Sequence, residues 1–465
     1  MCFIFPINVM KYKKNLHILL TLCLIGLVLL LSILFIKTQR DLYTTNAKFN
    51  EIYKKIIPLR KKNSHLEQLL KSNPNERIQY GIDFKETNQD IRILKNTKLS
   101  NGKTLKYYKL TKGFYAGINS VNMDFNFFPG SGFIDFYSSK LIILSAHGIL
   151  AFIDDIDNDI YFKQIKNNIN DFIDIDQFSK KDWYSLKDLH VHDNKIFISY
   201  TEELKKDCWN TSIIYGEFNY INIEFKKFFS SKKCINTFDN IDEEFNAHQS
   251  GGRIINFDKN HILFSIGDYR NRFLVQDESN INGKLIKIDL QTSKYEIISK
   301  GHRNPQGLYL NRENNFILET EHGPKGGDEI NLIQINKINE DKILNYGWPV
   351  ASYGEHYGNK EDLRIKKRYE KYPLLKSHKN FGFIEPLKSF QPSIGISEIT
   401  NVGENKYVVG SLKDRSLYFF EINDNKITNL ERVEVFERVR DLVYDGNRLY
   451  LFLEDTASIG IINLK

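Results

Sequence analysis

The chain has 465 residues, of which 41% are hydrophobic, 13% aromatic and 26% charged, with a formal net charge of +7. This length is sufficient for a large core and for up to three domains. The basic residues are spread among Asp and Glu rather than gathered in one stretch, so the charge pattern excludes a nucleic-acid-binding face.

The N-terminal segment has the pattern of a membrane anchor. Leu16–Ile36 is an almost unbroken apolar run, and about 20 such residues cross a bilayer. Lysines precede the run, and Lys37 and Arg40 follow it, which favours a cytoplasmic N-terminus. The run is long for a signal peptide and no small-residue cleavage site follows it, which favours an uncleaved anchor over a cleaved signal. We therefore expect residues 1–37 to be a cytoplasmic tip and single-pass inner-membrane anchor, with the rest of the chain periplasmic.

Residues 38–100 are expected to form a short helical stalk or linker. Apolar residues between positions 41 and 71 recur at spacings of three, four and seven, which suits an amphipathic helix, and Pro58 divides it. A stalk of this kind is a spacer or a surface for self-association.

Four cysteines indicate one possible disulfide. Cys2 and Cys23 lie in or near the anchor, which leaves Cys208 and Cys234. Outside the cytoplasm such a pair usually forms a disulfide, and the alternative is a pair of free buried thiols.

One strand pattern recurs six times between about residue 101 and the C-terminus. In each copy a polar turn precedes a Lys, Asn, His or Arg and then a run of mostly apolar residues, at Lys140–Leu144, Lys195–Ser199, His261–Ser265, Asn315–Glu319, Lys406–Gly410 and Arg448–Phe452. Several copies are followed by a second short strand after a polar turn. Six such units predict an all-β fold, a six-bladed β-propeller over residues 101–465.

Polar clusters fall on the loops between these strands. The turn at 302–307 contains Arg303, whose planar fork suits a carboxylate or a ring oxygen. The segment 321–329 contains Gly323 and Pro324, and Ca²⁺ accepts backbone carbonyls of this kind together with carboxylates. Spacing alone indicates a metal here only weakly.

Two other clusters lie outside that region. His248 stands before a Gly-Gly turn, where it is either a general base or a structural histidine. Arg438 and Arg440 are two residues apart at the start of a strand, so both side chains point the same way. Two adjacent cations call for an anionic ligand or for pairing with Asp or Glu.

Together and in this order, the clusters resemble the motifs of the pyrroloquinoline-quinone (PQQ)-dependent sugar dehydrogenases, the soluble quinoprotein glucose dehydrogenase and aldose sugar dehydrogenase family. The resemblance covers roughly residues 245–465 and is strongest in GHRNPQGL, EHGPKGGDEINLI and NYGWPVASYGEHY, with HQSGGR, Gly267-Asp268, SLKDR and RVRD in support. That family is a six-bladed propeller. The resemblance implies oxidation of an aldose or related polyol at the anomeric carbon, with PQQ held by Ca²⁺ and an external electron acceptor.

The resemblance also implies roles for individual residues. His248 matches the base and Arg303 the arginine near substrate and quinone. Quinone contacts are implied for Asn304, Ser393, Lys413, Arg438 and Arg440. Gly323 and Pro324 match the carbonyls on the calcium that holds the quinone, and Glu329 and the Tyr346 carbonyl match a second, structural calcium site.

The sequence departs from the family at two points. Glucose-oxidising members have an acidic residue before the base, where this chain has Ala247. A substrate-contacting glutamine expected in an early blade has no clear counterpart. Two alternatives therefore stay open: a metal-dependent propeller lactonase, and a non-catalytic propeller that binds carbohydrate or protein.

Overall fold

The computed structural model describes residues 31–32, 34–39, 93–110, 132–145, 148–159, 162–173, 186–338 and 342–465. The chain divides into two compact units, Met1–Leu66 and Glu67–Lys465. In the first unit, residues 31–32 and 34–39 are helical. Among the residues described, no helix is long and apolar enough to cross a membrane. Most of the predicted anchor and residues 40–92 of the predicted stalk lie outside the described residues, so the predicted self-association through the stalk stays a prediction.

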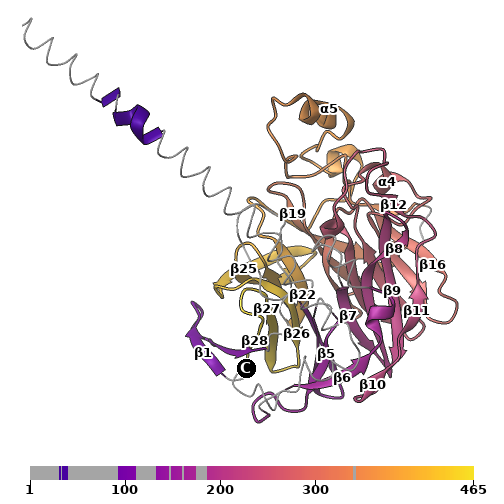
Figure 1. Ribbon diagram of the computed structural model, residues 1–465, viewed down its shortest axis with the longest axis vertical. Helices are drawn as coiled ribbons and strands as arrows, with labels where there is room; N and C mark the ends of the chain where they lie inside the picture. Colours follow the sequence, from indigo (N-terminus) through magenta and orange to yellow (C-terminus); the bar gives the residue numbers. More distant parts are fainter. Residues whose placement is uncertain are drawn as a thin grey trace, which may run out of the picture. The chain divides into compact units, whose positions relative to one another are not determined.

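The described part of the second unit contains six sheets, which follow one another along the chain (Figure 1). The first three are β3(Gly132–Tyr137), β4(Lys140–Ser145), β5(Leu150–Ile153), β6(Lys163–Asn167) and β10(Asn222–Ile223); β7(Leu186–His192), β8(Lys195–Lys205), β9(Cys208–Glu217), β11(Lys226–Phe229) and β12(Ile235–Asn236); and β13(Gly251–Asp258), β14(His261–Ile266), β15(Lys284–Asp289), β16(Tyr295–Lys300) and β20(Leu344–Asn345).

The other three sheets complete the set. They are β17(Pro305–Asn311), β18(Phe316–Glu321), β19(Asp328–Gln334) and β21(Lys388–Phe390); β22(Ile396–Gly403), β23(Lys406–Ser411), β24(Ser416–Asn423) and β25(Lys426–Glu434); and β26(Val439–Tyr444), β27(Arg448–Leu453), β28(Ser458–Asn463), β1(Ile93–Lys98) and β2(Thr104–Lys109). The last sheet joins strands from both ends of the unit, because β2 pairs with β28.

The first strands of the six sheets, called the inner strands, form a closed ring. Strand β3 packs beside β7, and the series continues through β13, β17, β22 and β26, which packs against β3 again. This closure confirms the predicted six-bladed β-propeller. Strand β1 precedes residue 101, so the last blade begins earlier than the predicted boundary.

The predicted repeat marks the second strand of every blade. The six copies correspond to β4, β8, β14, β18, β23 and β27. These strands lie between the sheets on either side, so both of their faces are buried, as the pattern of β14 shows from Ile262 to Ile266. Burial on both faces explains why their sequences read as apolar runs.

A charged cluster fills the centre of the ring. The Arg253 guanidinium on β13 lies 2.7 Å from a carboxylate oxygen of Asp188 and 2.8 Å from oxygens of Glu398 and Asp441. Each partner comes from the inner strand of a different blade. Burial raises the pKa of Asp188 to about 7 and that of Glu398 to about 8, while Arg253 opposes both shifts.

Carboxylates on the inner strands also connect neighbouring blades. The inner strands belong to separate sheets, and at four junctions a carboxylate on one inner strand accepts a backbone N–H of a neighbouring inner strand. These bonds join Asp441 to Ile134, Asp135 to Val191, Asp188 to Ile254 and Glu398 to Leu308, at 2.7, 2.8, 2.7 and 3.1 Å. One side chain therefore fixes each of four blade junctions.

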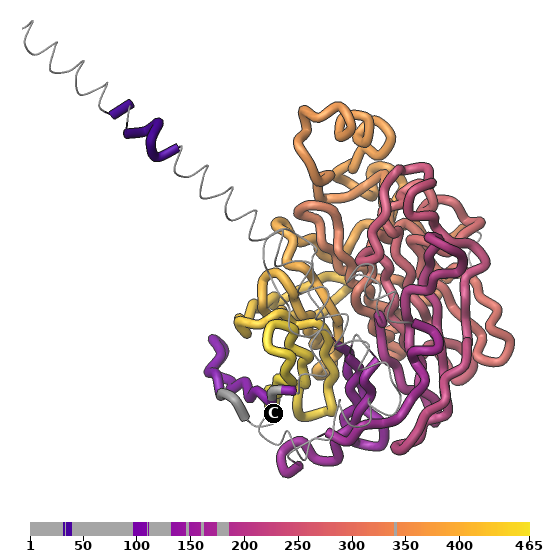
Figure 2. Tube along the Cα trace, in the orientation of Figure 1, coloured from indigo at the N-terminus to yellow at the C-terminus, as the bar shows by residue number. Residues whose placement is uncertain are grey.

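A segment between β20 and β21 leaves the sheets and returns, as the orange part of Figure 2 shows. It contains α5(Leu363–Lys371), which Asp362 caps by accepting the Arg364 N–H at 2.8 Å. Lys371 and Tyr372 bond Asp242 at 2.9 and 2.6 Å. The short elements are α4(Phe273–Gln276), η2(Ile169–Asp171), η3(Ala247–Gln249), η4(Ile335–Lys337) and η5(Lys379–Phe381).

Candidate active site at one end of the ring

The predicted site residues gather where the inner strands begin. His248 precedes β13, Arg303 and Asn304 precede β17, Ser393 precedes β22, and Arg438 immediately precedes β26. Equivalent strands of a repeated blade run in the same direction, so their starts meet at one end of the ring. Residues 111–131, directly before β3, lie outside the described part of the chain.

His248 lies in the short helix η3, which holds it firmly. Asn246 caps this helix by accepting the His248 N–H at 2.8 Å, and the preceding Ala247 is fully buried. Burial lowers the pKa of His248 well below its ordinary value, and Lys187 and Arg440 lower it further. The imidazole is therefore neutral at pH 7 and able to accept a proton.

Lys187 is a site residue that sequence reasoning missed. It lies on β7 and donates to the Ala247 carbonyl at 3.3 Å, beside the residue where an acidic side chain was expected. Burial lowers its pKa to about 7, with a smaller contribution from Arg440. No local motif marks this lysine, because it is the packing of β7 beside β13 that brings it next to the η3 loop.

Arg270 was also missed, although the nearby Gly267-Asp268 contributes to the family resemblance. Its positive charge contributes to lowering the pKa of His248. Tyr269 and Arg270 have φ of 52° and 66°, the left-handed region that side chains other than glycine rarely adopt. The neighbouring Asp268 accepts the Trp348 indole N–H at 2.8 Å, which anchors this turn.

Arg303 reaches the predicted calcium loop. Its guanidinium donates to the carbonyls of His322 and Gly323 at 2.8 and 2.6 Å and lies 5.5 Å from the centre of the Trp348 ring. Asn304 accepts the Gly251 N–H at 3.2 Å, which connects this turn to the His248 loop.

Ser393 holds the Gly323–Gly327 loop in place. Its hydroxyl oxygen accepts the Gly326 and Gly327 N–H groups at 2.9 and 3.0 Å, and the hydroxyl donates to the Pro324 carbonyl at 3.4 Å. A Cβ on Gly323 would lie 1.6 Å from the Gly327 oxygen, so the loop accepts only glycine there.

The late cations have different surroundings. Arg438 and Arg440 share one carboxylate, Glu454, at 2.9 and 2.5 Å. Glu454 is therefore the acidic partner that the sequence left open for this pair. The Lys413 side chain is exposed. The backbone N–H of Lys413 donates to the Ile394 carbonyl at 3.0 Å, next to Ser393. Arg438 also donates to the Leu412 carbonyl at 3.3 Å, so these residues lie side by side.

Glu329 and Tyr346 lie away from this cluster. Glu329 is buried, with a carboxylate oxygen 3.8 Å from Nε2 of His378, and burial raises its pKa well above the ordinary value. Tyr346 stacks on His302 with ring centroids 4.9 Å apart.

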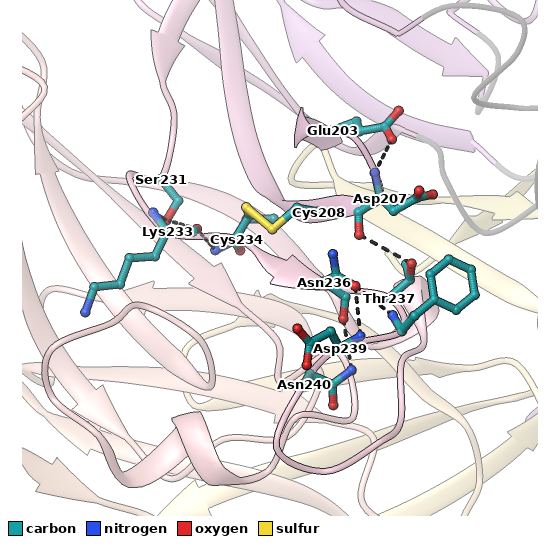
Figure 3. Close-up of a disulfide and its surroundings, with 12 residues drawn as sticks. Glu203, Asp207, Cys208, Ser231, Lys233, Cys234, Asn236, Thr237, Asp239 and Asn240 are labelled. Carbon is teal, nitrogen blue, oxygen red and sulfur yellow. Dashed lines mark hydrogen bonds between the residues drawn. A yellow bond between two sulfur atoms is a disulfide. The ribbon is translucent and has the colours of Figure 1, made fainter.

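Cys208 and Cys234 are joined by a disulfide (Figure 3). The bond links the start of β9 to the segment before β12, and Ile235 of β12 pairs with Trp209 of β9. Trp209 in turn packs in one buried cluster with Ala247 and Tyr269. The disulfide therefore lies next to the buried cluster against which the His248 loop packs.

The donor set fits an anionic cofactor with a hard cation. The pKa of His248 is lowered by the charges of four nearby cations, which are Lys187, Arg270, Arg438 and Arg440. The last two share the carboxylate of Glu454. The Gly323 carbonyl accepts one hydrogen bond from Arg303 and keeps a second lone pair for a metal.

The fold and the site thus define a β-propeller with a histidine set among cations at one end of its ring. A family model described as glucose/sorbosone dehydrogenase matches residues 184–462. The chain belongs to this family.

The chain is similar to many known proteins, of which three are informative. Aldose sugar dehydrogenase YliI of Escherichia coli is 29% identical over 232 residues, which cover 45% of this chain and 58% of that protein. Quinoprotein glucose dehydrogenase B of Acinetobacter calcoaceticus is 36% identical over 142 residues, 24% of this chain and 28% of that protein. Both matches span less than two thirds of these relatives.

The third is a solved structure, the PQQ-bound form of aldose sugar dehydrogenase from Streptomyces coelicolor. It has a TM-score of 0.51 at 15% identity and covers 80% of this chain and 97% of that one. At this identity the likeness concerns the fold.

Proposed function

We propose that this chain is a PQQ-dependent sugar dehydrogenase that oxidises an aldose or related polyol at the anomeric carbon. The observation that carries the proposal is the convergence of a neutral, half-buried His248 with Lys187, Arg438 and Arg440. Such a set accepts a proton from a substrate hydroxyl and binds a ligand rich in carboxylates. Family membership and the names of the relatives support the same reaction class.

The proposed roles follow from position. His248 takes the proton of the anomeric hydroxyl, and Arg303 orients the substrate from the neighbouring blade. Asn304, Ser393, Lys413, Arg438 and Arg440 would hold PQQ, and the carbonyls of Gly323 and Pro324 would hold its Ca²⁺. When bound, PQQ supplies a two-electron acceptor for hydride and Ca²⁺ a Lewis acid. Glu329 and the Tyr346 carbonyl would hold a second, structural Ca²⁺, and an external acceptor would reoxidise the cofactor.

The test is a titration of the purified full-length chain with PQQ and Ca²⁺, followed by absorbance and thermal unfolding. We expect saturable binding, and dye reduction with at least one sugar of an aldose panel. Arg440→Gln should weaken PQQ binding, because it removes a cation from the cluster, while Arg432→Gln, exposed on β25, should not. Absence of PQQ binding by the unmodified chain would refute the proposal. Binding without reduction by any sugar would favour the non-catalytic propeller.

We further propose that the chain is a single-pass inner-membrane protein with the propeller on the periplasmic side. The apolar run at 16–36 and the bridged Cys208 and Cys234 support this location. The experiment is protease treatment of intact and permeabilised spheroplasts with an epitope on the C-terminus. Digestion of the epitope only after permeabilisation of the inner membrane would contradict it.

A further inference from the structure

A buried polar cluster lies between β18 and β19. Of its residues, only Glu329 has been given a role above. Glu319 and Glu321 are on β18, and their cross-strand partners on β19 are Asn331 and Glu329. Alternate residues of a strand point to the same face, so these four side chains share one face of the sheet. His302, from the turn before β17, completes the cluster. His302, Glu319 and Glu321 are 0%, 0% and 3% exposed.

The cluster carries more negative charge than its surroundings balance. Within the described part of the chain, no Lys or Arg side chain forms an ion pair with Glu319, Glu321 or Glu329; their ion-pair partners there are the imidazoles of His302 and His378. A buried carboxylate without a compensating cation is strongly unfavourable, and opposed like charges on adjacent strands add to the cost. The calcium proposed at Glu329 would compensate one of these carboxylates, and Glu319 and Glu321 need protons or a second cation.

Three polar atoms of the cluster have no hydrogen-bond partner among the described residues. They are Nδ1 of His302, Oε1 of Glu319 and Oδ1 of Asn331, all enclosed. More than about 90% of buried polar groups in proteins are hydrogen-bonded, so three orphan atoms in one cluster point to a missing ligand. His302 is otherwise fixed, because its Nε2 lies 2.8 Å from the Ser299 hydroxyl.

The geometry suits a metal ion. Nδ1 of His302 is 3.6 Å from an oxygen of Glu319 and 3.8 Å from an oxygen of Glu321, and the three ligand atoms lie within 4.8 Å of one another. Ligands at about 2.0–2.2 Å around a tetrahedral ion are roughly 3.3–3.6 Å apart. We propose that His302, Glu319 and Glu321 bind a divalent transition-metal ion of the zinc class.

The donor set favours this class over calcium. An imidazole nitrogen suits zinc and its neighbours, whereas Ca²⁺ takes oxygen ligands. The Ser299 hydroxyl is positioned to accept the Nε2–H of His302, which leaves the Nδ1 lone pair for the metal, as ligating histidines usually require. The Asn331 amide donates to Glu319 and Glu321 at 2.9 and 3.1 Å and orients both carboxylates.

The ion would also support the active-site end of β17. The second oxygen of Glu321 accepts the backbone N–H of Arg303. A metal that fixes Glu321 therefore fixes the turn from which Arg303 extends. The site is independent of PQQ, because none of its three ligands belongs to the proposed cofactor set.

The test uses the full-length chain, stripped with a chelator and without PQQ. Zn²⁺ is added alone and in the presence of a hundredfold excess of Ca²⁺, and bound metal is measured by mass spectrometry after dialysis. We expect one zinc per chain that calcium does not displace, and a rise in the unfolding temperature. Glu319→Gln should abolish both, and Glu313→Gln, exposed on the β17–β18 turn, should change neither.

The outcomes separate a metal from protons. If protons neutralise the cluster, Glu319→Gln removes the need for one of them and raises the unfolding temperature, while zinc has no effect; that result would overturn the proposal. Failure to bind zinc, with only calcium retained at the site proposed for Glu329, would overturn it as well. His302→Gln is the second variant should Glu319→Gln fail to fold, and it too should lose the zinc.

Discussion

At the residue scale, His248 combines the two properties that a base in this site needs. Burial and nearby cations lower its pKa, and a capped short helix fixes its backbone. An acidic orienting side chain is absent at Ala247. The Lys187 ammonium bonds the Ala247 carbonyl instead, so a positive charge holds the loop where a negative one was expected.

Replacement of His248 by glutamine tests its role directly. We expect kcat/KM for the sugar to fall about 10²- to 10⁴-fold, the usual contribution of a general base, with PQQ affinity retained. His261→Gln is the matched control, because His261 pairs with Asp258 at the β13–β14 turn, at the opposite end of β13 from His248. An unchanged rate in His248→Gln would remove the histidine from the mechanism.

Lys187 should set the pH range of activity. Its positive charge lowers the pKa of His248, so Lys187→Met should raise that pKa. Because the base must be neutral, the acid limb of kcat/KM should move to higher pH, and activity below the ordinary histidine pKa of about 6.5 should be lost first. Lys195→Met on β8 should leave the limb in place. A limb that moves to lower pH would contradict the assignment.

At the element scale, a hydroxyl from another segment helps to hold the loop Gly323–Gly327 in place. Ser393 accepts two of its backbone N–H groups, and both carbonyls proposed for calcium lie within or next to the bonded turn. The loop is therefore shaped before any ion binds.

Ser393→Ala should weaken calcium binding. Two backbone donors lose their acceptor, which costs about 1–3 kcal/mol and lets the loop relax. The expected result is a higher Ca²⁺ concentration for half-maximal PQQ binding, measured by titration at fixed PQQ. Thr292→Ala, on an exposed turn, controls for general effects. Equal calcium dependence in both variants would show that the hydroxyl does not shape the loop.

The sequence predicted the blades unequally for a physical reason. Second strands are buried on both faces, so all six appeared as apolar runs. Inner strands carry polar residues such as Asp188, Arg253 and Glu398 toward the centre, which breaks their pattern. Strands β1 and β2 were missed because their pairing with β28 joins distant parts of the chain, and no local signal records it.

The site was predicted where motifs exist and missed where topology supplies the residue. His248, Arg303 and Arg438 stand in recognisable turns, and the structure brings them to one end of the ring. Lys187 and Glu454 have ordinary local sequences. Lys187 reaches the site because β7 packs beside β13, and Glu454 meets the arginine pair through the β26–β27 hairpin.

At the scale of the whole molecule, the central cluster holds the ring together. Among the described residues, Arg253 is the one cation paired with Asp188, Glu398 and Asp441, all of them buried. Removing one partner of a buried ion pair leaves charges without compensation, and here three carboxylates would be left.

Arg253→Leu should therefore destabilise the propeller by about 3–5 kcal/mol, measured as the free energy of unfolding in denaturant. Arg432→Leu is the comparison, since Arg432 pairs with Asp414 at the surface and should cost less than about 1 kcal/mol. The loss in Arg253→Leu should grow as pH rises, because the carboxylates around it ionise. Equal effects of the two substitutions would refute a central role.

The carboxylate bonds between inner strands have a consequence for how such a ring is assembled in evolution. Four junctions use the same kind of connection, a carboxylate on one blade and a backbone N–H on its neighbour. In three the N–H lies on the following blade, and at β17–β22 it lies on the preceding one. A backbone donor is present in every strand, whatever its sequence. The inner strands β3 and β7 each carry both halves of this joint, a carboxylate and a donor N–H, so a copy of either blade could be inserted beside it without any change in its neighbours. Because the same kind of bond can join different blades, the packing angle between the sheets determines the number of blades.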